Sequence, residues 1–583
     1  MERKTSLCAV PASTDGLSGK ELRPMLLAAS LCAILTLPVA WNARAFISSD
    51  GVSYLEMALN TIRYGPRCLL TNGSWSPGYP ALLAVALKLA HPSPVSELIV
   101  VHSLDWAICA SMYFCFTYFF VNLLRWIHLA RGPVLGKRSR FLGTLAFTYT
   151  LLFISNLDVT LWLVGPNIML EGSVYLVAGV CIRLSLPDAR FIHQAALGVL
   201  LALAYITKAV MFPLSFVLLA IFLVRPACRH LGRKGTAVAA VAFLLAASPL
   251  VAGLSYSRGR MTFSDIGNLN FAWYVNEVPR YWDLQLPDSV TLLHAPKTIS
   301  INPAIVKFDG PIDSTYSYWY DPSYWYDGVK AHLDVRQVLR QFLRFLGIVP
   351  TTRPYSTNLL HLSRRWIPLY AGLVAFVVLG LRFGNLYQVI RPQFWLFLWP
   401  AVAVFTFACV HAEYRYLVPF VVLAWTTLFA AALVLTGGDR STAINLAVAV
   451  WLILTYCPAF AKQLVRNQTR PAAWQNPAIE AKLQALGIRP GDELASMGFA
   501  DYAYDARLVG ARFTIQIPNG NHSVPPRDDP AAFSKLPETE VRRTLAILKA
   551  NGAKALFSAW RPAFDNDSGW VPIGERDYVR MLQ

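Results

Sequence analysis

Residues 25–60 read MLLAASLCAILTLPVAWNARAFISSDGVSYLEMALN. The segment 25–43 is apolar and close in length to the ~20 residues with which a helix crosses the hydrocarbon core of a bilayer. Asp50 follows it, and apolar residues then recur at helical spacing, at Val52, Leu55, Leu59 and Ile62. The stretch therefore predicts a membrane span and then an amphipathic helix over 51–64 at the outer interface, with Asp50 at its N-terminal end.

The rest of the chain has the same apolar character. Of its 583 residues 55% are hydrophobic and 15% charged, and the mean hydropathy is +0.42, too high for a soluble globular protein. Further apolar runs lie at 97–124, 141–157, 167–184, 194–225, 237–255, 366–382, 393–410, 416–436 and 443–462. The run 194–225 is too long for one span and predicts a tight pair, which gives about eleven transmembrane helices.

Lysines and arginines in the short connections set the orientation, because they tend to stay on the cytoplasmic side. Basic clusters lie around 125–140, 183–190, 225–234 and 382–391. Placing all of them inside puts the N-terminus inside and the C-terminus outside. The run 79–90 is too short to cross and is expected to lie along the outer surface. No removable signal peptide precedes the first run, which is expected to stay as an anchor.

The sequence thus predicts three parts. They are a cytoplasmic tail over 1–24, a transmembrane domain over 25–462 with outer loops 44–96 and 256–365, and an extracytoplasmic soluble domain over 463–583. In the last part the order helix, glycine-containing turn and strand occurs twice, in NPAIEAKLQALGIRPGDELASMG and in VRRTLAILKANGAKALFSAW. This order is typical of a small α/β domain. The expected fold is a polytopic α-helical membrane protein with a long extracytoplasmic loop and a small C-terminal α/β domain.

The formal net charge is +18, and nine cysteines form neither a disulfide framework nor a CxxC metal pair. The charge comes from the cytoplasmic clusters and from a basic outer loop. Its arginines are Arg336, Arg340, Arg344, Arg353, Arg364 and Arg365. Such a loop suits anionic lipid headgroups or a phosphorylated lipid as partners, and the topology excludes nucleic acid.

Asp50 has two interpretations. It could cap the helix that follows, a role that Asp often takes, although Ser48 and Ser49 could cap equally well. Alternatively it is a general base, which removes the proton of a hydroxyl or amine as that group attacks an electrophilic carbon.

Two cationic motifs also have alternatives. Lys208 interrupts the run 194–225, and a cation there is costly enough to suggest a function, with a lipid phosphate as partner; the alternative is snorkelling to the interface. In HAEYRY, residues 411–416, Arg415 could hold a phosphate with Glu413 orienting it. The alternative there is an interfacial aromatic belt with a local ion pair.

Two aromatic segments lie on the outer side. WSPGYPALL, residues 75–83, predicts a rigid turn around Tyr79 and could be an interfacial anchor. STYSYWYDPSYWYDG, residues 314–328, is dense in aromatic side chains, which suit sugar C–H surfaces as well as packing against the bilayer or the bundle. Trp319, Tyr320 and Trp325 are its candidate sugar or acceptor contacts.

The order of these features resembles the GT-C fold glycosyltransferases, a superfamily that includes protein O-mannosyltransferases and lipid A aminoarabinose transferases. A first span, an outer Asp before a YLEMA helix, WSPGYPALL and then a long span are similar to the N-terminal module of that superfamily. AYITKAVMFPL, residues 204–214, and HAEYRYLVPF, residues 411–420, extend the likeness over most of 25–462. The resemblance implies an outer acid as catalytic base, a polyprenyl-phosphate-linked sugar as donor, and inversion at the anomeric carbon.

The resemblance also assigns expected roles. Asp50 is the base. A second outer acid is expected to assist it, and of the two candidates, Asp158 and Glu171, Asp158 is the better positional match. Expected donor phosphate contacts are Lys208, Arg258, Arg260 and Arg415. Expected supporting residues are Glu56, Glu171, His411, Glu413 and Tyr79. Because Gly51 stands where the family often has a second acid, no cofactor is certain, and a divalent metal ion stays open.

The sequence therefore predicts a membrane glycosyltransferase that transfers a sugar from a polyprenyl-phosphate donor to a lipid, glycan or protein acceptor on the periplasmic or lumenal face, in a bacterial inner membrane. One alternative is a lipid-linked glycan flippase or transporter without catalytic chemistry. Transporter sites lie near the midplane, whereas the polar groups here gather at the outer ends of spans. A further alternative is a C-terminal binding module on a degenerate membrane anchor.

Overall fold

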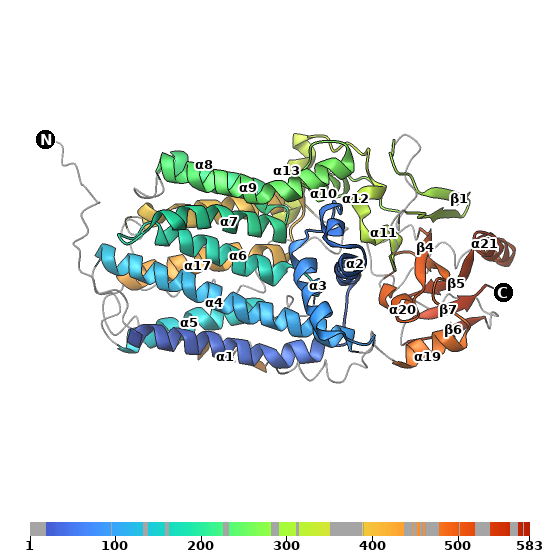
Figure 1. Ribbon diagram of the computed structural model, residues 1–583, viewed down its shortest axis with the longest axis horizontal. Coiled ribbons are helices and arrows are strands. Elements are labelled where there is room, and N and C mark those ends of the chain that lie inside the picture. Colours follow the sequence, from blue (N-terminus) through green and yellow to red (C-terminus); the bar gives the residue numbers. More distant parts are fainter. Residues whose placement is uncertain are drawn as a thin grey trace.

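The computed structural model describes the chain from residue 19 to residue 582 with internal gaps. The gaps are 95, 132–137, 158–162, 225–231, 282–290, 311–313, 350–387, 389, 436–446, 448–449, 452, 455–456, 459–460, 462–476, 501, 519–536, 560–568 and 575–576. Figure 1 shows a bundle of long helices, a layer of shorter helices at one end of it, and a β-sheet beyond that layer.

The bundle contains most of the long apolar helices. They are α1 (Gly19–Ala43), α4 (Glu97–Arg131), α5 (Arg138–Leu157), α6 (Asn167–Arg183), α7 (Phe191–Thr207), α8 (Met211–Val224), α9 (Arg233–Arg258), α16 (Trp395–Val410) and α17 (Tyr414–Leu435). α4 packs along α1 and α6, and α7 packs along α9. Large apolar side chains fill the core and also cover the outside, as at Leu27 and Leu245, both 69% exposed. An apolar exterior of this kind suits lipid.

Four helices of the described chain are long and apolar enough to cross a bilayer, by length and composition alone. They cover Glu21–Ala43, Glu97–Leu129, Arg233–Arg258 and Tyr414–Ala431. α7, α8 and α16 are apolar but shorter, and the run 194–225 is a pair of helices with a three-residue connection. The chain is an integral membrane protein, and the number of about eleven spans stays a prediction.

The layer at the end of the bundle consists of α2 (Ser49–Tyr64), η1 (Pro66–Leu70), α3 (Gly78–Ala90), α10 (Ile266–Tyr274), α11 (Ser317–Tyr320), α12 (Pro322–Trp325) and α13 (Val335–Leu346). A short turn, η2 (Arg391–Gln393), leads into α16. Figure 1 shows α3 running across the axis of the bundle rather than along it. The sequence predicted that this segment lies along the outer surface, because it is too short to cross the bilayer.

α2 was predicted as an amphipathic helix at the outer interface, but its polar side is buried. Val52 and Leu55 are buried as the apolar pattern predicts, but Ser49, Ser53 and Glu56 on its polar positions are buried as well. α11 and α20 (Ala503–Leu508) cover this polar side. Polar groups of Thr315 and Arg507 form hydrogen bonds with Glu56. α2 is therefore an internal helix between the bundle and the sheet.

Within the described residues the sheet has seven strands, in the order β1-β2-β4-β3-β5-β7-β6. The strands are β1 (Lys297–Ile301), β2 (Ala304–Lys307), β3 (Glu493–Met497), β4 (Arg512–Ile517), β5 (Ala553–Ser558), β6 (Trp570–Pro572) and β7 (Tyr578–Met581). β4, β3 and β5 are parallel, and the β1–β2 hairpin adds antiparallel to β4. The helices α19 (Pro477–Ala485), α20 (Ala503–Leu508) and α21 (Glu538–Ala550) accompany them.

The two helix-then-strand segments predicted from the sequence are α19 with β3 and α21 with β5. The sheet differs from the predicted domain 463–583 in one respect, because β1 and β2 come from the long loop 256–365. β2 pairs with β4, with Val306 opposite Gln516. The hairpin thus adds two strands that lie outside the domain 463–583 predicted from the sequence.

Ion pairs connect α20, beside the sheet, to α2 and α4. Arg507 of α20 bonds Glu97 at 2.6 Å and Glu56 at 3.0 Å. Nearby, the hydroxyl of Ser49 donates to the carbonyl of Ala500 at 3.3 Å. The sheet is thus attached directly to the helix that carries Asp50.

Candidate functional site at the end of the bundle

Asp50 lies in the first turn of α2 and does not cap it. The cap is Ser48, whose hydroxyl accepts a hydrogen bond from the backbone N–H of Gly51 at 3.3 Å. The capping interpretation of Asp50 is therefore wrong, because the earlier serine already occupies that position. The positive end of the helix dipole still favours a carboxylate in this turn.

Two side chains from distant segments hold the Asp50 carboxylate. The indole Nε1 of Trp319 donates to Oδ1 at 3.0 Å, and a guanidinium nitrogen of Arg415 lies 3.4 Å from Oδ2. The side chain of Asp50 is still 26% exposed. Its oxygens are thus oriented by two donors and remain open on one side.

Arg415 belongs to a compact polar cluster at the start of α17. Its Nε donates to Glu413 at 2.6 Å, and Glu413 also contacts His411 Nε2 at 2.9 Å and accepts from the Tyr416 hydroxyl at 3.2 Å. Burial favours the neutral acid, but Arg415 and His411 outweigh it and hold the pKa of Glu413 well below its usual range. Glu413 is therefore a permanent anion that orients Arg415.

Lys208 lies in the connection between α7 and α8. Its Nζ is 3.2 Å from the Asn167 side-chain oxygen and 3.6 Å from the centre of the Tyr416 ring. Among the described residues it has no carboxylate partner. Burial, and then the nearby Arg415, lower the pKa of Lys208 to about 7. Two cations thus contact the same tyrosine, and one of them also contacts Asp50.

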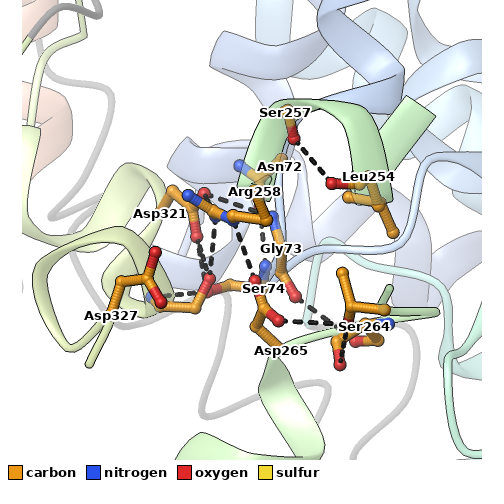
Figure 2. A network of polar contacts seen from close by, with 12 residues as sticks. Asn72, Gly73, Ser74, Leu254, Ser257, Arg258, Ser264, Asp265, Asp321 and Asp327 are labelled. Carbon is orange, nitrogen blue, oxygen red and sulfur yellow. Dashed lines mark hydrogen bonds and ion pairs between the residues drawn. The ribbon is translucent and has the colours of Figure 1, made fainter. Parts of the chain in front are cut away.

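Arg258, one of the expected phosphate contacts, lies in a different network, which Figure 2 shows. Arg260, another of them, bonds two aspartates of the same network. Arg258 bonds Asp265 at 2.8 Å and Asp321 at 2.6 Å, and its side chain is only 5% exposed. Arg260 bonds Asp265 at 2.8 Å and Asp327 at 3.3 Å. These contacts leave Arg258 closed to a lipid phosphate, so its expected role does not fit the geometry.

The network instead joins three chain segments. Besides its contact with Arg258, Asp321 accepts hydrogen bonds from the backbone of Gly73 at 3.1 Å and from the Ser74 hydroxyl at 2.8 Å (Figure 2). It therefore links the end of α9, the turn before α3 and the segment that carries Trp319.

We expect Arg258→Met to lower the stability of the chain by ~3–5 kcal/mol, because it leaves Asp265 and Asp321 buried without their cation. Arg260→Met is the matched control, since its side chain is 46% exposed and an exposed pair contributes less than about 1 kcal/mol. Thermal unfolding in detergent measures both. Equal losses would show that the network does not stabilise the fold through Arg258.

The expected supporting residues have partners of their own. Glu56 accepts from the Thr315 hydroxyl at 2.6 Å besides pairing with Arg507 of α20. The Tyr79 hydroxyl donates to Asp105 at 2.7 Å inside the helix layer. Neither residue contacts Asp50 or Arg415. Their position indicates a structural role.

Glu171 lies inside α6. It is 1% exposed, and it accepts from the Tyr175 hydroxyl at 2.6 Å and from the Asn156 amide at 3.2 Å. Asp158 lies outside the described residues. Within the part of the chain that the structure describes, no three His, Cys, Asp or Glu side chains come together as a metal site.

Comparison with solved structures gives two kinds of match. ArnT of Cupriavidus metallidurans in the apo state has 13% identity and a TM-score of 0.51, with 95% of this chain and 98% of that chain covered. ArnT bound to undecaprenyl phosphate has 13% identity and a TM-score of 0.51, with 97% and 99% covered. The oligosaccharyltransferase of Archaeoglobus fulgidus in the apo form has 12% identity and a TM-score of 0.52, with 92% and 69% covered.

Both are GT-C glycosyltransferases, and the match extends over nearly the whole of this chain. The chain has the GT-C fold. No protein-family model matches its sequence, and no curated protein sequence matches it. The likeness is therefore one of fold, as the resemblance in the sequence implied.

The aromatic segment 314–328 supplies one side chain to the site of this GT-C fold. Trp319 contacts Asp50, whereas Tyr320 is 5% exposed and accepts from Asn60, and Trp325 is 4% exposed and donates to the carbonyl of Ser317. Of the three expected sugar contacts, only Trp319 borders Asp50. The other two pack inside the protein, one of the alternatives left open above.

Two residues beside the GT-C site were missed in the sequence. Asn167 and Tyr416 both contact Lys208. Tyr416 lies within HAEYRY, which the sequence already singled out, and Asn167 lies four positions before Glu171. Their polarity at the end of an apolar run was the available signal. Which cation they contact depends on how α6, α7 and α17 pack together, and no local pattern encodes that.

Proposed function

We propose that this chain transfers a sugar from a polyprenyl-phosphate donor to an acceptor on the outer face of a bacterial inner membrane. One observation carries the proposal. A partly open carboxylate, Asp50, lies 3.4 Å from Arg415, and Arg415 shares the Tyr416 ring with Lys208. A general base and two cations for a leaving phosphate therefore lie together at one end of an apolar bundle.

Two structural neighbours add support from their ligands. ArnT has been solved with undecaprenyl phosphate, and the archaeal oligosaccharyltransferase with a dolichol-phosphate and an inhibitory peptide, at a TM-score of 0.50. A phosphorylated polyprenyl lipid is thus a ligand on both of these GT-C folds. We extend that ligand class to this chain.

The reaction follows from these groups. An acceptor O–H or N–H attacks the anomeric carbon, its proton passes to Asp50, and the bond between that carbon and the phosphate oxygen breaks. The bonding electrons leave with the polyprenyl phosphate, whose added negative charge Arg415 and Lys208 stabilise. Attack opposite the leaving group inverts the anomeric carbon.

Donor binding would also change the contacts of Asp50. Arg415 divides its donors between Glu413 at 2.6 Å and Asp50 at 3.4 Å, and the longer contact is the weaker one. A phosphate beside Arg415 would compete for that donor. Asp50 would then keep its hydrogen bond from Trp319 and have Oδ2 free for the acceptor proton.

Phosphate affinity should depend on pH through Lys208. A lysine with a pKa of about 7 is charged below that pH and largely neutral above it, so undecaprenyl phosphate should bind more tightly at pH 6 than at pH 8.5. The phosphate itself gains negative charge as pH rises, and this change alone would strengthen its binding to cations. A lower affinity at pH 8.5 therefore cannot come from the phosphate. Lys208→Met should bind more weakly and remove the fall above pH 7. Titration of the lipid onto the purified chain at both pH values measures this; a wild-type affinity that does not fall would contradict it.

The function itself is tested by mass spectrometry of glycans and glycolipids from cells that express the wild type, Asp50→Asn, or no protein. A sugar modification found only with the wild type supports transfer. A flippase needs no base, so a glycan profile with Asp50→Asn equal to wild type would favour transport instead. The candidate groups lie at the end of the bundle, whereas a transporter site is expected near the midplane of the membrane.

A further inference from the structure

α13 has an outward face that the proposed reaction does not use. Val335 and Leu339, one turn apart on this face, are 73% and 54% exposed. Arg336 and Arg340 form a second exposed row beside them. Leu333 before the helix and Ile348 after it are 79% and 66% exposed. The face therefore combines an apolar stripe with a cationic stripe.

The opposite face fixes α13 against the bundle. Gln341 and Phe345 are buried, and the ring of Phe342 packs on that of Phe405 in α16 at 5.5 Å between centroids. Phe405 is 57% exposed on an apolar helix of the bundle, which is the surface that lipid chains contact. α13 thus borders the lipid-facing side of α16.

α13 lies at the level where the long helices end. Figure 1 shows it in the layer where the long helices end and the sheet has not yet begun. Gln337 of α13 accepts a hydrogen bond from Asn276, just after α10, at 3.0 Å. A helix at this level meets acyl chains on one side and water on the other. Exposed leucine and valine beside exposed arginine suit that boundary.

The charge on this face is of one sign. Residues 335–346 contain three arginines and no acid. Arg344 is engaged by Glu277 at 3.0 Å, whereas Arg336 and Arg340 make no ion pair within the described parts of the chain. Two free guanidinium groups next to lipid fit phosphate oxygens, with which arginine bonds bidentately.

We infer that α13 lies in the surface of the bilayer and binds acidic phospholipid headgroups, with Val335 and Leu339 among the upper acyl chains and Arg336 and Arg340 on the phosphates. This surface is independent of the transfer reaction. The chain that leads into α13 also carries Trp319, which contacts Asp50.

The depth of Leu339 tests the first half of this inference. The full chain with Leu339→Cys carries a bimane label in proteoliposomes of phosphatidylcholine and phosphatidylglycerol, and the signal of labelled wild type is subtracted. Leu245→Cys, in the middle of α9, and Arg543→Cys, on α21, are matched controls for the bilayer core and for water. All three side chains are more than half exposed, so none of the substitutions disturbs packing.

We expect lipids brominated near the headgroup end of their chains to quench the label at position 339 more than lipids brominated near the chain ends. The order should reverse at position 245, and position 543 should show no quenching. A label at 339 that behaves like the one at 543 overturns the inference. A label shielded from both brominated lipid and aqueous iodide also overturns it, because protein then covers the face.

Lipid preference tests the second half. Brominated phosphatidylglycerol should quench the 339 label more than the same fraction of brominated phosphatidylcholine, with an enrichment of about fivefold per arginine. Arg336→Gln with Arg340→Gln should abolish the difference, as should 1 M salt, which shortens the Debye length to roughly 3 Å. Arg542→Gln with Arg543→Gln on α21 is the charge-matched control. Equal quenching by both lipids in the wild type would overturn headgroup binding.

Discussion

Asp50→Asn is expected to lower the rate of sugar transfer by about 10²–10⁴-fold, the usual contribution of a general base. Asparagine keeps the size of the side chain and an oxygen that can accept from Trp319 Nε1, now at 3.0 Å. It loses only the negative charge that takes the acceptor proton. The contact with Arg415 is long and partly exposed, so its loss should cost less than about 1 kcal/mol of stability.

Ser48→Ala is the control that separates chemistry from helix capping. Since Ser48 is the cap of α2, this variant should lose about 1 kcal/mol of stability and keep most of its transfer rate. Asp50→Asn should show the reverse pattern. Transfer rate and melting temperature of both variants are the measurements, and an Asn variant as active as wild type would exclude Asp50 as the base.

Removal of either cation should weaken donor binding. Each charge-assisted contact contributes about 1.5–3 kcal/mol, so Lys208→Met and Arg415→Met should each raise the dissociation constant of undecaprenyl phosphate by about 10–150-fold. Lys208→Met should keep or raise the melting temperature, because it replaces a buried cation that has no carboxylate partner among the described residues. Binding by titration and melting by calorimetry measure these effects.

Arg415→Met needs a matched partner variant. Alone it leaves Glu413 without its cation, which can destabilise the chain by ~3–5 kcal/mol and lower binding through misfolding. Glu413→Gln with Arg415→Met removes both charges together and should restore the melting temperature but not the affinity. Donor affinity equal to wild type in this double variant and in Lys208→Met would show that the phosphate binds elsewhere.

The sequence was informative where one segment decides the outcome. The apolar run 25–43, the helix after Asp50 and the break at Lys208 each depend on local periodicity, and the structure has α1, α2 and the α7–α8 connection at those places. Asp50, Lys208 and Arg415 were selected as polar groups at the ends of apolar runs. Their mutual proximity was implied by the resemblance.

The sequence was uninformative where pairing between distant segments decides. Arg258 and Arg260 looked available because the aspartates that neutralise them include Asp321 and Asp327, more than sixty positions away. The polar side of α2 looked exposed because its cover, Thr315 and Arg507, comes from segments far along the chain. The sequence around a charged residue or a polar helix face does not show whether a distant segment will pair with it.

The β1–β2 hairpin has a consequence for biosynthesis. It is made long before β4, the strand it pairs with: Tyr316, just after the hairpin, bonds Gln516 of β4 across 200 positions. Until the last part of the chain emerges, β2 has an unpaired edge, and such edges attract other strands. A chain cut before residue 463 would carry that edge permanently, and the segment 463–583 made alone would expose the matching edge of β4. We therefore expect either half to aggregate when it is expressed alone. In the full chain β2 is protected only after β4 has been synthesised and has paired with it.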